Sequence, residues 1–360
     1  MGIQGLWSYL TKNHYDAFVS LSDDLSVFQG QTWVIDVSIY MYKFGTRVTF
    51  VEEFLEQARK LQAFGIRPVY IFDGKRHPIK RFEHSRRREQ ALRSIENTAQ
   101  RQVLLQRLDT HPDATVETVR QWVAELGPGH VQKVMIQHAV LHVEGLDDIE
   151  LNLNREQLTA AVRDREPKPQ VHIPDSHYDD LMLALEHANI AFYIATGDAE
   201  KCGAYLCRHG LADVLVTDDG DALVFGCPAV VRNLFRGGKM GMELVRVPDL
   251  LNKMQLTRAQ MVDLAIMCGC DYTEARGLPG IGPAKAVKIL LTYGSLAAYL
   301  DSLEWMARQS TLNFDMSRLQ YREAEVLFLD DAPQIEYTSL ALDPTARPIT
   351  NIKQEMDLNN

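Results

Sequence analysis

The sequence lacks the features that mark membrane and secreted proteins. No run of about 18 apolar residues appears, so we predict no membrane-spanning segment. The N-terminus, Met-Gly-Ile-Gln-Gly-Leu, does not have the charged and then apolar layout of a signal peptide. Leu6 stands where an N-myristoylation motif requires Ser or Thr. We therefore expect an intracellular protein that is not secreted.

Cysteine and net positive charge are also scarce. The five cysteines form no Cys-x-x-Cys pair and have no matching histidine spacing, so neither a zinc site nor a disulfide framework is expected. Lys and Arg number 38 against 48 Asp and Glu, which gives a net charge of -10. Such a chain does not coat nucleic acid by charge alone. If nucleic acid is its substrate, basic residues must be concentrated locally.

Strand-like and helix-like patterns alternate along the chain. Short β-branched and aromatic runs predict buried strands at Trp33–Val37, Pro68–Phe72, Ile190–Ala195, Val214–Val216 and Ala229–Leu234. Helical periodicity falls at Val51–Phe64, Ile79–Leu108, Tyr178–His187, Ala199–Arg208 and Arg258–Met267. This alternation predicts an α/β fold with a mainly parallel sheet flanked by helices.

Punctuation by proline and glycine suggests how the chain is divided. We predict an N-terminal region 1–108, an insertion 109–177, a second region 178–300 and a C-terminal extension 301–360. The insertion carries His-Pro-Asp, Gly-Pro-Gly and Glu-Pro-Lys-Pro turns, which break the alternation. The extension contains no motif that indicates a function.

Acidic residues follow several of the predicted strands and helices. They are Asp36, Asp73, Asp198, Glu200, Asp219, Asp221 and Asp271. The carboxyl ends of parallel strands meet at one edge of a sheet, so we expect these acids to converge. A single acid after a strand is more often a helix cap, but their joint occurrence favours one site. Asp218 faces away from its neighbours on an extended chain and is left out.

Carboxylates that crowd together repel one another unless cations neutralise them. Oxygen ligands in this number suit Mg²⁺, with Mn²⁺ as a substitute. Two such ions can activate water and orient a phosphate, which is the chemistry of phosphodiester hydrolysis. The acidic set therefore predicts a metal-dependent hydrolase of phosphate esters.

The segment Lys75 to Arg107 is strongly basic in an otherwise acidic chain. On a helix, Lys80, His84 and Arg87 share one face, where they could stabilise charge on a phosphate beside the metals. From Arg93 onward a solvated helix face is an equally good interpretation. Tyr42 follows Asp36 on the next helix, where it either stacks on a base or fills the core.

A glycine turn precedes a helix at Leu278–Ala286. Its Gly280, Ile281 and Gly282 let a nucleic-acid backbone approach the helix N-terminus, and Lys285 adds charge without reading bases. The alternative is a helix–helix turn that binds no ligand. By itself the pattern indicates a grip on a nucleic-acid backbone.

In this order, the motifs resemble those of the flap endonuclease family, which includes exonuclease 1 and the xeroderma pigmentosum group G nuclease. The matching stretches are Met-Gly-Ile-Gln-Gly-Leu-Trp, Val-Ile-Asp-Val-Ser, Ile-Phe-Asp-Gly-Lys, Gly-Asp-Ala-Glu-Lys-Cys, Thr-Asp-Asp-Gly-Asp-Ala-Leu-Val-Phe-Gly, Gly-Cys-Asp-Tyr and Gly-Ile-Gly-Pro-Ala-Lys-Ala, within residues 1–300. The resemblance implies a PIN-like fold with a helical arch and a helix-two-turn-helix element. It makes 1–108 and 178–300 the two nuclease regions and 109–177 part of the arch.

The resemblance also implies roles for single residues. It assigns metal binding to the acids named above, contact with the scissile phosphate to Lys80 and Arg87, and base stacking to Tyr42. Gly2 lines the same pocket once Met1 is removed, Arg88 joins the DNA contacts, and the glycine turn holds a potassium ion that helps to grip the duplex.

Three departures from the family pattern bear on these roles. Asp198 stands where the family usually has Glu, so this carboxylate is shorter by one methylene. Ala275–Gly282 is longer than in eukaryotic flap endonucleases, and so is the stretch between Asp73 and Asp198 that contains the arch. In addition to these three, the tail lacks the sliding-clamp motif, so clamp binding is not predicted. A longer arch without that motif is similar to what compact relatives in large DNA viruses have.

We expect a structure-specific 5′ flap endonuclease and 5′-3′ exonuclease, acting on branched or flapped DNA in replication, repair or recombination, in the nucleus or wherever the genome is copied. The alternatives are a Holliday-junction or RNA-directed nuclease of the same family, and a non-catalytic junction-binding protein. A PIN-like RNA-processing nuclease would leave the glycine turn unexplained. Oligomeric state and pathway are left open by the sequence.

Overall fold

The computed structural model describes residues 2–75, 80–111, 113–126, 173–235, 241–312, 314–332 and 335–339. The chain divides into two compact units. The larger unit consists of Met1–Glu83 and Val171–Asn360, and the smaller unit is His84–Gln170. No helix in the described residues is long and apolar enough to cross a membrane.

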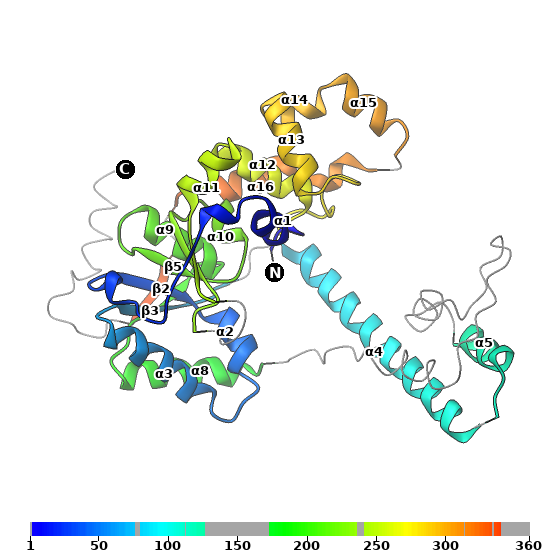
Figure 1. Cartoon of the computed structure of the whole chain (residues 1–360), viewed down its shortest axis with the longest axis horizontal. Coiled ribbons are helices and arrows are strands. Elements are labelled where there is room, and N and C mark those ends of the chain that lie inside the picture. Colours follow the sequence, from blue (N-terminus) through cyan, green and yellow to red (C-terminus); the bar gives the residue numbers. More distant parts are fainter. Residues whose placement is uncertain are drawn as a thin grey trace. The chain divides into compact units, whose positions relative to one another are not determined.

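The larger unit is built on one sheet (Figure 1). Its described strands follow the order β1-β7-β6-β5-β2-β3-β4-β8. Neighbours from β6 to β4 run parallel, and the pairs at both edges are antiparallel, so the predicted mainly parallel sheet is confirmed. The strands are β1 (Phe18–Ser20), β2 (Thr32–Asp36), β3 (Arg67–Phe72), β4 (Phe192–Ala195), β5 (Val214–Val216), β6 (Ala229–Arg232), β7 (Glu243–Arg246) and β8 (Ile335–Ser339).

Helices cover both faces of this sheet, and the predicted helices are confirmed. The described helices of the larger unit are α1 (Leu6–Asn13), α2 (Val37–Phe44), α3 (Phe50–Ala63), α8 (Asp175–His187), α9 (Ala199–Arg208), α10 (Asp221–Val224), α11 (Val247–Met254), α12 (Arg258–Cys268), α13 (Pro283–Tyr293), α14 (Leu296–Leu300), α15 (Leu303–Gln309) and α16 (Tyr321–Leu329). Short 3-10 turns lie at Tyr15–Ala17, Ser26–Phe28 and Met316–Leu319.

Alternation along the strands produces two hydrophobic cores, one on each face. On β2, Val34 packs into the core that α9 and α12 share, whereas Trp33 and Ile35 pack into the core that α2, α3 and α8 share. All three side chains are buried. Successive strand residues point to opposite faces, so a strand covered by helices on both faces is apolar throughout. The strands are therefore held rigidly, and the residues that follow them are positioned accurately.

The smaller unit contains the helices α4 (Arg81–Thr110), which begins within the larger unit, and α5 (Val116–Glu125). Leu104 and Leu108 of α4 pack against Val119 and Val123 of α5. An ion pair of 2.6 Å between Arg107 Nη1 and Glu125 Oε2 also joins α4 to α5. Most of the predicted insertion 109–177, from 127 to 172, lies outside the described residues.

The strands that the sequence analysis did not predict are β1, β7 and β8. Each lies in an antiparallel part of the sheet, and β1 and β8 are its edges. β1 buries only Phe18 and exposes the rest, so it shows no strand-like apolar run. β8 falls in the C-terminal extension, and it forms a strand because it pairs with β4, not because of a local sequence pattern.

Gly74 fixes the loop after β3, since its N–H donates to Gly197 O at 2.7 Å. A Cβ at Gly74 would lie 1.7 Å from Ala195 O, whereas a Cβ at Gly197 would meet nothing within 4 Å. We predict that Gly74→Ala costs more than about 3 kcal/mol and that Gly197→Ala changes stability by less than about 1 kcal/mol. Urea unfolding of both variants checks this. Equal stabilities would show that the two loops do not pack as described.

Candidate metal centre at the carboxyl edge of the sheet

Four neighbouring parallel strands end at the same edge and deliver acids to it. β2 ends on Asp36, and β3 is followed directly by Asp73. The registers pair Asp36 with Ile71, and Ile35 with Val216, so these strand ends are level. β4 leads to Asp198, which precedes α9, and β5 leads to the loop that carries Asp219. The predicted convergence therefore follows from the sheet itself.

Local hydrogen bonds orient each carboxylate at this edge. Asp36 caps α2, since its Oδ1 accepts from Ser38 N at 2.9 Å, and its Oδ2 accepts from Thr217 Oγ1 at 2.9 Å. Asp73 Oδ1 accepts from Ala199 N at 2.8 Å, and its Oδ2 accepts from the Ser38 hydroxyl. Asp73 is thus tied to both α9 and α2.

Asp219 lies in the buried loop between β5 and α10, and Asp221 is the first residue of α10. Asp219 Oδ1 accepts from Asp221 N at 3.0 Å, and Asp219 N donates to Thr217 Oγ1 at 3.1 Å. Both side chains are buried, and so is Asp271, which follows α12. Burial raises the pKa of both Asp219 and Asp221, and repulsion from Asp271 adds to this effect.

Asp73, Asp198 and Glu200 form a second group at this edge. One carboxylate oxygen from each lies within 4.8 Å of the other two. Glu200 sits in the first turn of α9, and Asp198 stands at the residue before that helix. Such a spacing of oxygens can hold one divalent ion.

The acids raise one another's pKa. Burial is the largest cause for Asp36, Glu200 and Asp221, whose pKa values lie well above the usual range. Repulsion adds to burial, from Asp73 at Asp36, from Asp36 at Glu200 and from Asp219 at Asp221. The site is therefore costly when the carboxylates are ionised and no cation is bound.

Lys80 is the basic residue placed among these acids. Its Nζ donates to Asp198 Oδ1 at 2.7 Å, and both side chains are largely buried. Burial alone would lower the pKa of Lys80, but Asp198, Glu200 and Asp221 outweigh it and raise that pKa. Lys80 therefore stays charged at the acidic edge.

Tyr272 supports both Lys80 and Asp198, and the sequence analysis did not single it out. Its hydroxyl donates to Asp198 Oδ2, and Lys80 Nζ lies 4.7 Å from the centre of its ring. The ring is fully buried and packs against Phe225 and Phe328. The Gly-Cys-Asp-Tyr motif contained this signal, because Tyr272 directly follows Asp271.

The donor set fits a hard divalent cation. Asp221 Oδ1 is buried and has no hydrogen-bond partner among the described residues. A buried carboxylate oxygen without a partner is strongly unfavourable, and a metal ion would satisfy it. Gly2 closes the same cradle, since a Cβ there would lie 2.2 Å from Asp219 Oδ1 and 2.6 Å from Asp221 Oδ1. No larger residue fits at Gly2 without displacing these acids.

Asp218, which the sequence analysis left out, belongs to the scaffold of the site. Its Oδ2 pairs with Lys43 Nζ at 2.9 Å, and its Oδ1 accepts from Asn233 N at 2.9 Å. Its carbonyl accepts from Trp7 Nε1 at 2.9 Å, which attaches α1 to this loop. Asp218 is thereby saturated with protein contacts.

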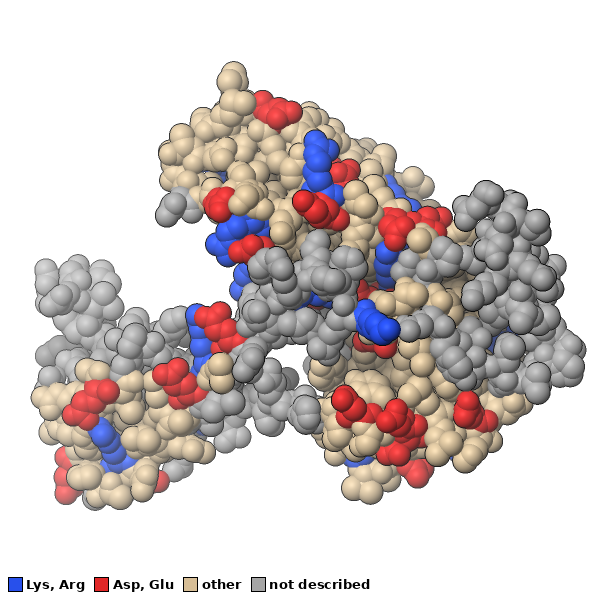
Figure 2. All heavy atoms as spheres, turned by 180° about the vertical axis from the view of Figure 1, so that it is seen from behind, with Lys and Arg blue, Asp and Glu red and all other residues tan. Residues whose placement is uncertain are grey.

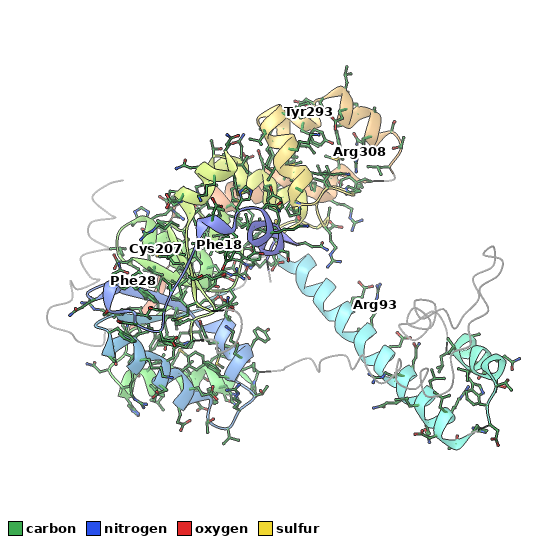
Figure 3. All side chains as sticks on the ribbon, viewed as in Figure 1. Phe18, Phe28, Arg93, Cys207, Tyr293 and Arg308 are labelled. Carbon is green, nitrogen blue, oxygen red and sulfur yellow. The ribbon has the colours of Figure 1, made fainter. Side chains whose placement is uncertain are left out.

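Tyr42 projects from α2 and is 51% exposed, so it does not fill the core. Arg87 and Arg88 lie on α4, but their side chains, like that of His84, lie outside the described residues. Arg93 is exposed and pairs with Glu89, as on a solvated helix face (Figure 3). Figure 2 shows acidic and basic side chains interspersed over the described part of one face, without a continuous basic surface there.

The glycine turn lies before α13, in the helical group that α12, α13 and α14 form. Gly282 stands at the residue before this helix, and Gly280 has a left-handed backbone with φ of 65°. Gly280 and Gly282 are exposed, whereas the Ile281 side chain is buried. The Ile281 side chain is therefore not available to a ligand.

Comparison with known proteins agrees with this geometry. Residues 1–94 match the XPG N-terminal domain, and residues 189–271 match the XPG I-region. Flap endonuclease 1 of Cryptosporidium muris is 25% identical over 350 residues, which cover 89% of this chain and 61% of the relative. Flap endonuclease 1 of Methanothrix thermoacetophila is 33% identical over 169 residues, which cover 44% of this chain and 46% of the relative.

Solved structures show the same fold. The catalytic core of Rad2 in complex with DNA substrate superposes with a TM-score of 0.56 at 18% identity, covering 93% of this chain and 90% of that one. Flap endonuclease-1 from Methanococcus jannaschii superposes with a TM-score of 0.53 at 18% identity, covering 94% of this chain and 90% of that one. Both family regions contain acids of the site, Asp36 and Asp73 in the first and Asp198 to Asp271 in the second. The chain belongs to the flap endonuclease and XPG family.

Proposed function

We propose that the chain is a divalent-metal-dependent, structure-specific 5′ flap endonuclease with associated 5′-3′ exonuclease activity on DNA. The observation that carries this proposal is the convergence of buried carboxylates around Asp221, whose Oδ1 has no partner among the described residues. Relatives named flap endonuclease 1 and the DNA-bound Rad2 core support DNA as the substrate.

The carboxylates would hold two Mg²⁺ or Mn²⁺ ions between them. The residues are Asp36, Asp73, Asp198, Glu200, Asp219, Asp221 and Asp271. When bound, such ions lower the pKa of water and polarise the phosphate. The division into the Asp73, Asp198 and Glu200 group and the buried Asp219, Asp221 and Asp271 group supports more than one ion.

Lys80 would donate to an oxygen of the scissile phosphate, because its charge is maintained and its partner Asp198 is shared with Tyr272. A positioned cation of this kind stabilises negative charge as the phosphate bond breaks. Following the family resemblance, Arg87, seven residues later in the sequence, would act on the same phosphate. Arg88 and the exposed ring of Tyr42 would contact the DNA strand beside it.

Cleavage of branched substrates tests the function directly. We predict that the wild-type protein in Mg²⁺ cuts 5′-flap DNA faster than nicked, gapped, four-way or RNA oligonucleotides. Asp221→Asn should reduce cleavage by at least about 10³-fold while leaving flap binding measurable, because it removes a metal ligand and keeps the side-chain shape. Asp213→Asn, at the opposite end of β5, is the matched control and should cut normally.

If a four-way junction or RNA is cut faster than the 5′ flap, that molecule and not the flap is the preferred substrate. Binding without cleavage of any substrate in Mg²⁺ or Mn²⁺ would identify a junction-binding protein. Full activity of Asp221→Asn would reject the metal site altogether.

The repulsion at the site predicts a stability effect that is independent of cleavage. Neutralising Asp221 should raise the melting temperature of the metal-free protein by about 2–6 °C, because its ionised carboxylate is buried, repelled and unsatisfied. Mg²⁺ should raise the melting temperature of the wild type and have little effect on Asp221→Asn. Calorimetry in EDTA and in Mg²⁺ checks both effects. A metal-free Asp221→Asn that melts below the wild type would contradict them.

Lys80 should affect the chemical step more than binding. Lys80→Gln is expected to lower the single-turnover rate by about 10²–10³-fold with flap affinity nearly unchanged. Arg93→Gln, in the same basic segment but paired with Glu89 on an exposed face, is the control. A Lys80→Gln defect confined to KM would show that Lys80 binds substrate without stabilising the transition state.

A further inference from the structure

Two positively charged side chains of the protein donate hydrogen bonds to the glycine turn before α13. Arg308 Nη2, from α15, donates to Pro279 O at 2.6 Å. Lys285 Nζ, from α13, donates to Gly280 O at 3.2 Å. The preceding carbonyl, Leu278 O, accepts from Ile281 N at 3.1 Å. Successive carbonyls of this turn are therefore each engaged by a donor of the protein.

The Arg308 guanidinium fits against the turn because residue 280 is a glycine and has no side chain. A Cβ at Gly280 would lie 3.0 Å from Arg308 Nη2, and Gly280 has φ of 65°, which side chains rarely adopt. Figure 3 labels Arg308 on the helical segment next to α13, where Tyr293 is labelled. Arg308 lies outside the matched XPG regions and outside every motif of the sequence. It reaches the turn only through the packing of α14 and α15 after α13.

A potassium ion does not fit this turn. Such an ion exchanges its hydration shell for several oxygens at once. Here Pro279 O accepts from the Arg308 guanidinium, and Gly280 O accepts from the Lys285 ammonium. A further cation on these oxygens would be repelled by both positive charges. Two like charges about 4 Å apart repel by roughly 1–4 kcal/mol between water and a protein surface. The residues present therefore disagree with the potassium site that the family resemblance implies.

We propose that Arg308 takes the place of the bound cation at this turn. It holds the turn through Pro279 O and supplies, with Lys285, the positive charge that a DNA phosphate meets at the N-terminus of α13. Arg308 is thus a positioning residue for duplex binding, and that binding does not depend on potassium. The inference rests on the proposed function, in which the turn grips duplex DNA.

Equilibrium binding of a labelled 5′-flap DNA in EDTA tests this without cleavage. The wild-type Kd is measured at equal concentrations of KCl and tetramethylammonium chloride, because the large organic cation cannot be held by carbonyl oxygens. Equal concentrations are needed since affinity for DNA falls with salt. We expect the two Kd values to agree within about twofold. Thermal unfolding in the two salts gives a second readout, with the same melting temperature expected.

Three variants distinguish the contact that Arg308 makes at the turn from a general loss of positive charge. Arg308→Gln should raise Kd by about tenfold, since it removes a charge-assisted hydrogen bond and the charge of the turn. Arg308→Lys should recover most of that loss. Arg322→Gln, an exposed arginine on α16 of the same unit, removes an equal charge away from the turn and should bind like the wild type. Should Arg308→Gln fail to fold, Lys285→Gln and the salt comparison on the wild type still decide the question.

Severalfold tighter binding in KCl than in tetramethylammonium chloride would overturn the inference and leave the proposed nuclease intact. Equal Kd values for Arg308→Gln and Arg322→Gln would overturn the role of Arg308. A wild type that binds flap DNA in neither salt would reject the proposed function, and this inference with it.

Discussion

Electrostatic repulsion among carboxylates at one edge of the sheet is the constraint on which the rest of the structure depends. The parallel strands β2, β3, β4 and β5 end together, so their acids are brought together whether or not a cation is present. A repulsion of about 4 kcal/mol between two charges 4 Å apart near a protein surface is comparable with the whole stability of a domain, about 5–15 kcal/mol. Burial raises the pKa values of Asp36, Glu200 and Asp221, and this repulsion raises them further.

The chain offsets this repulsion only in part. Thr217 satisfies one oxygen of Asp36, and Lys80 and Tyr272 satisfy the two oxygens of Asp198, but Asp221 Oδ1 has no partner in the described part of the protein. The glycine turn before α13 is the opposite case, because its carbonyls are engaged by cations of the chain. Under our two proposals, the acidic edge would acquire a metal ion and the glycine turn would do without one. Catalysis at the acidic edge would then require a divalent ion, whereas binding of duplex DNA at the glycine turn would not require potassium.

The sequence predicted the sheet and its acidic edge because both follow from local pattern. Apolar runs mark the buried strands, and each acid comes within a few residues of a strand or helix end. The contacts that complete the site could not be predicted in this way. Tyr272 reaches Asp198 across 74 positions and Arg308 reaches Pro279 across 29, so packing, and no local periodicity, brings them together. The antiparallel edges were missed for the same reason, since β8 is defined by its partner β4.

The departure at position 198 takes on a physical meaning in the structure. The shorter Asp198 side chain accepts from Lys80 on one oxygen and from the Tyr272 hydroxyl on the other. Under the proposed function, its contribution to a metal ion would therefore be coupled to Lys80, the cation that would meet the phosphate. Asp73 and Glu200, whose oxygens lie within 4.8 Å of it, share that group.

Anomalous diffraction from crystals soaked in Mn²⁺ tests the central claim most directly, because it locates bound ions without reference to catalysis. The account predicts Mn²⁺ density about 2.0–2.2 Å from Asp221 Oδ1 and ligated by neighbouring carboxylates of the sheet edge. Density confined to other surfaces, with Asp221 Oδ1 still unligated in a fully soaked crystal, would contradict it.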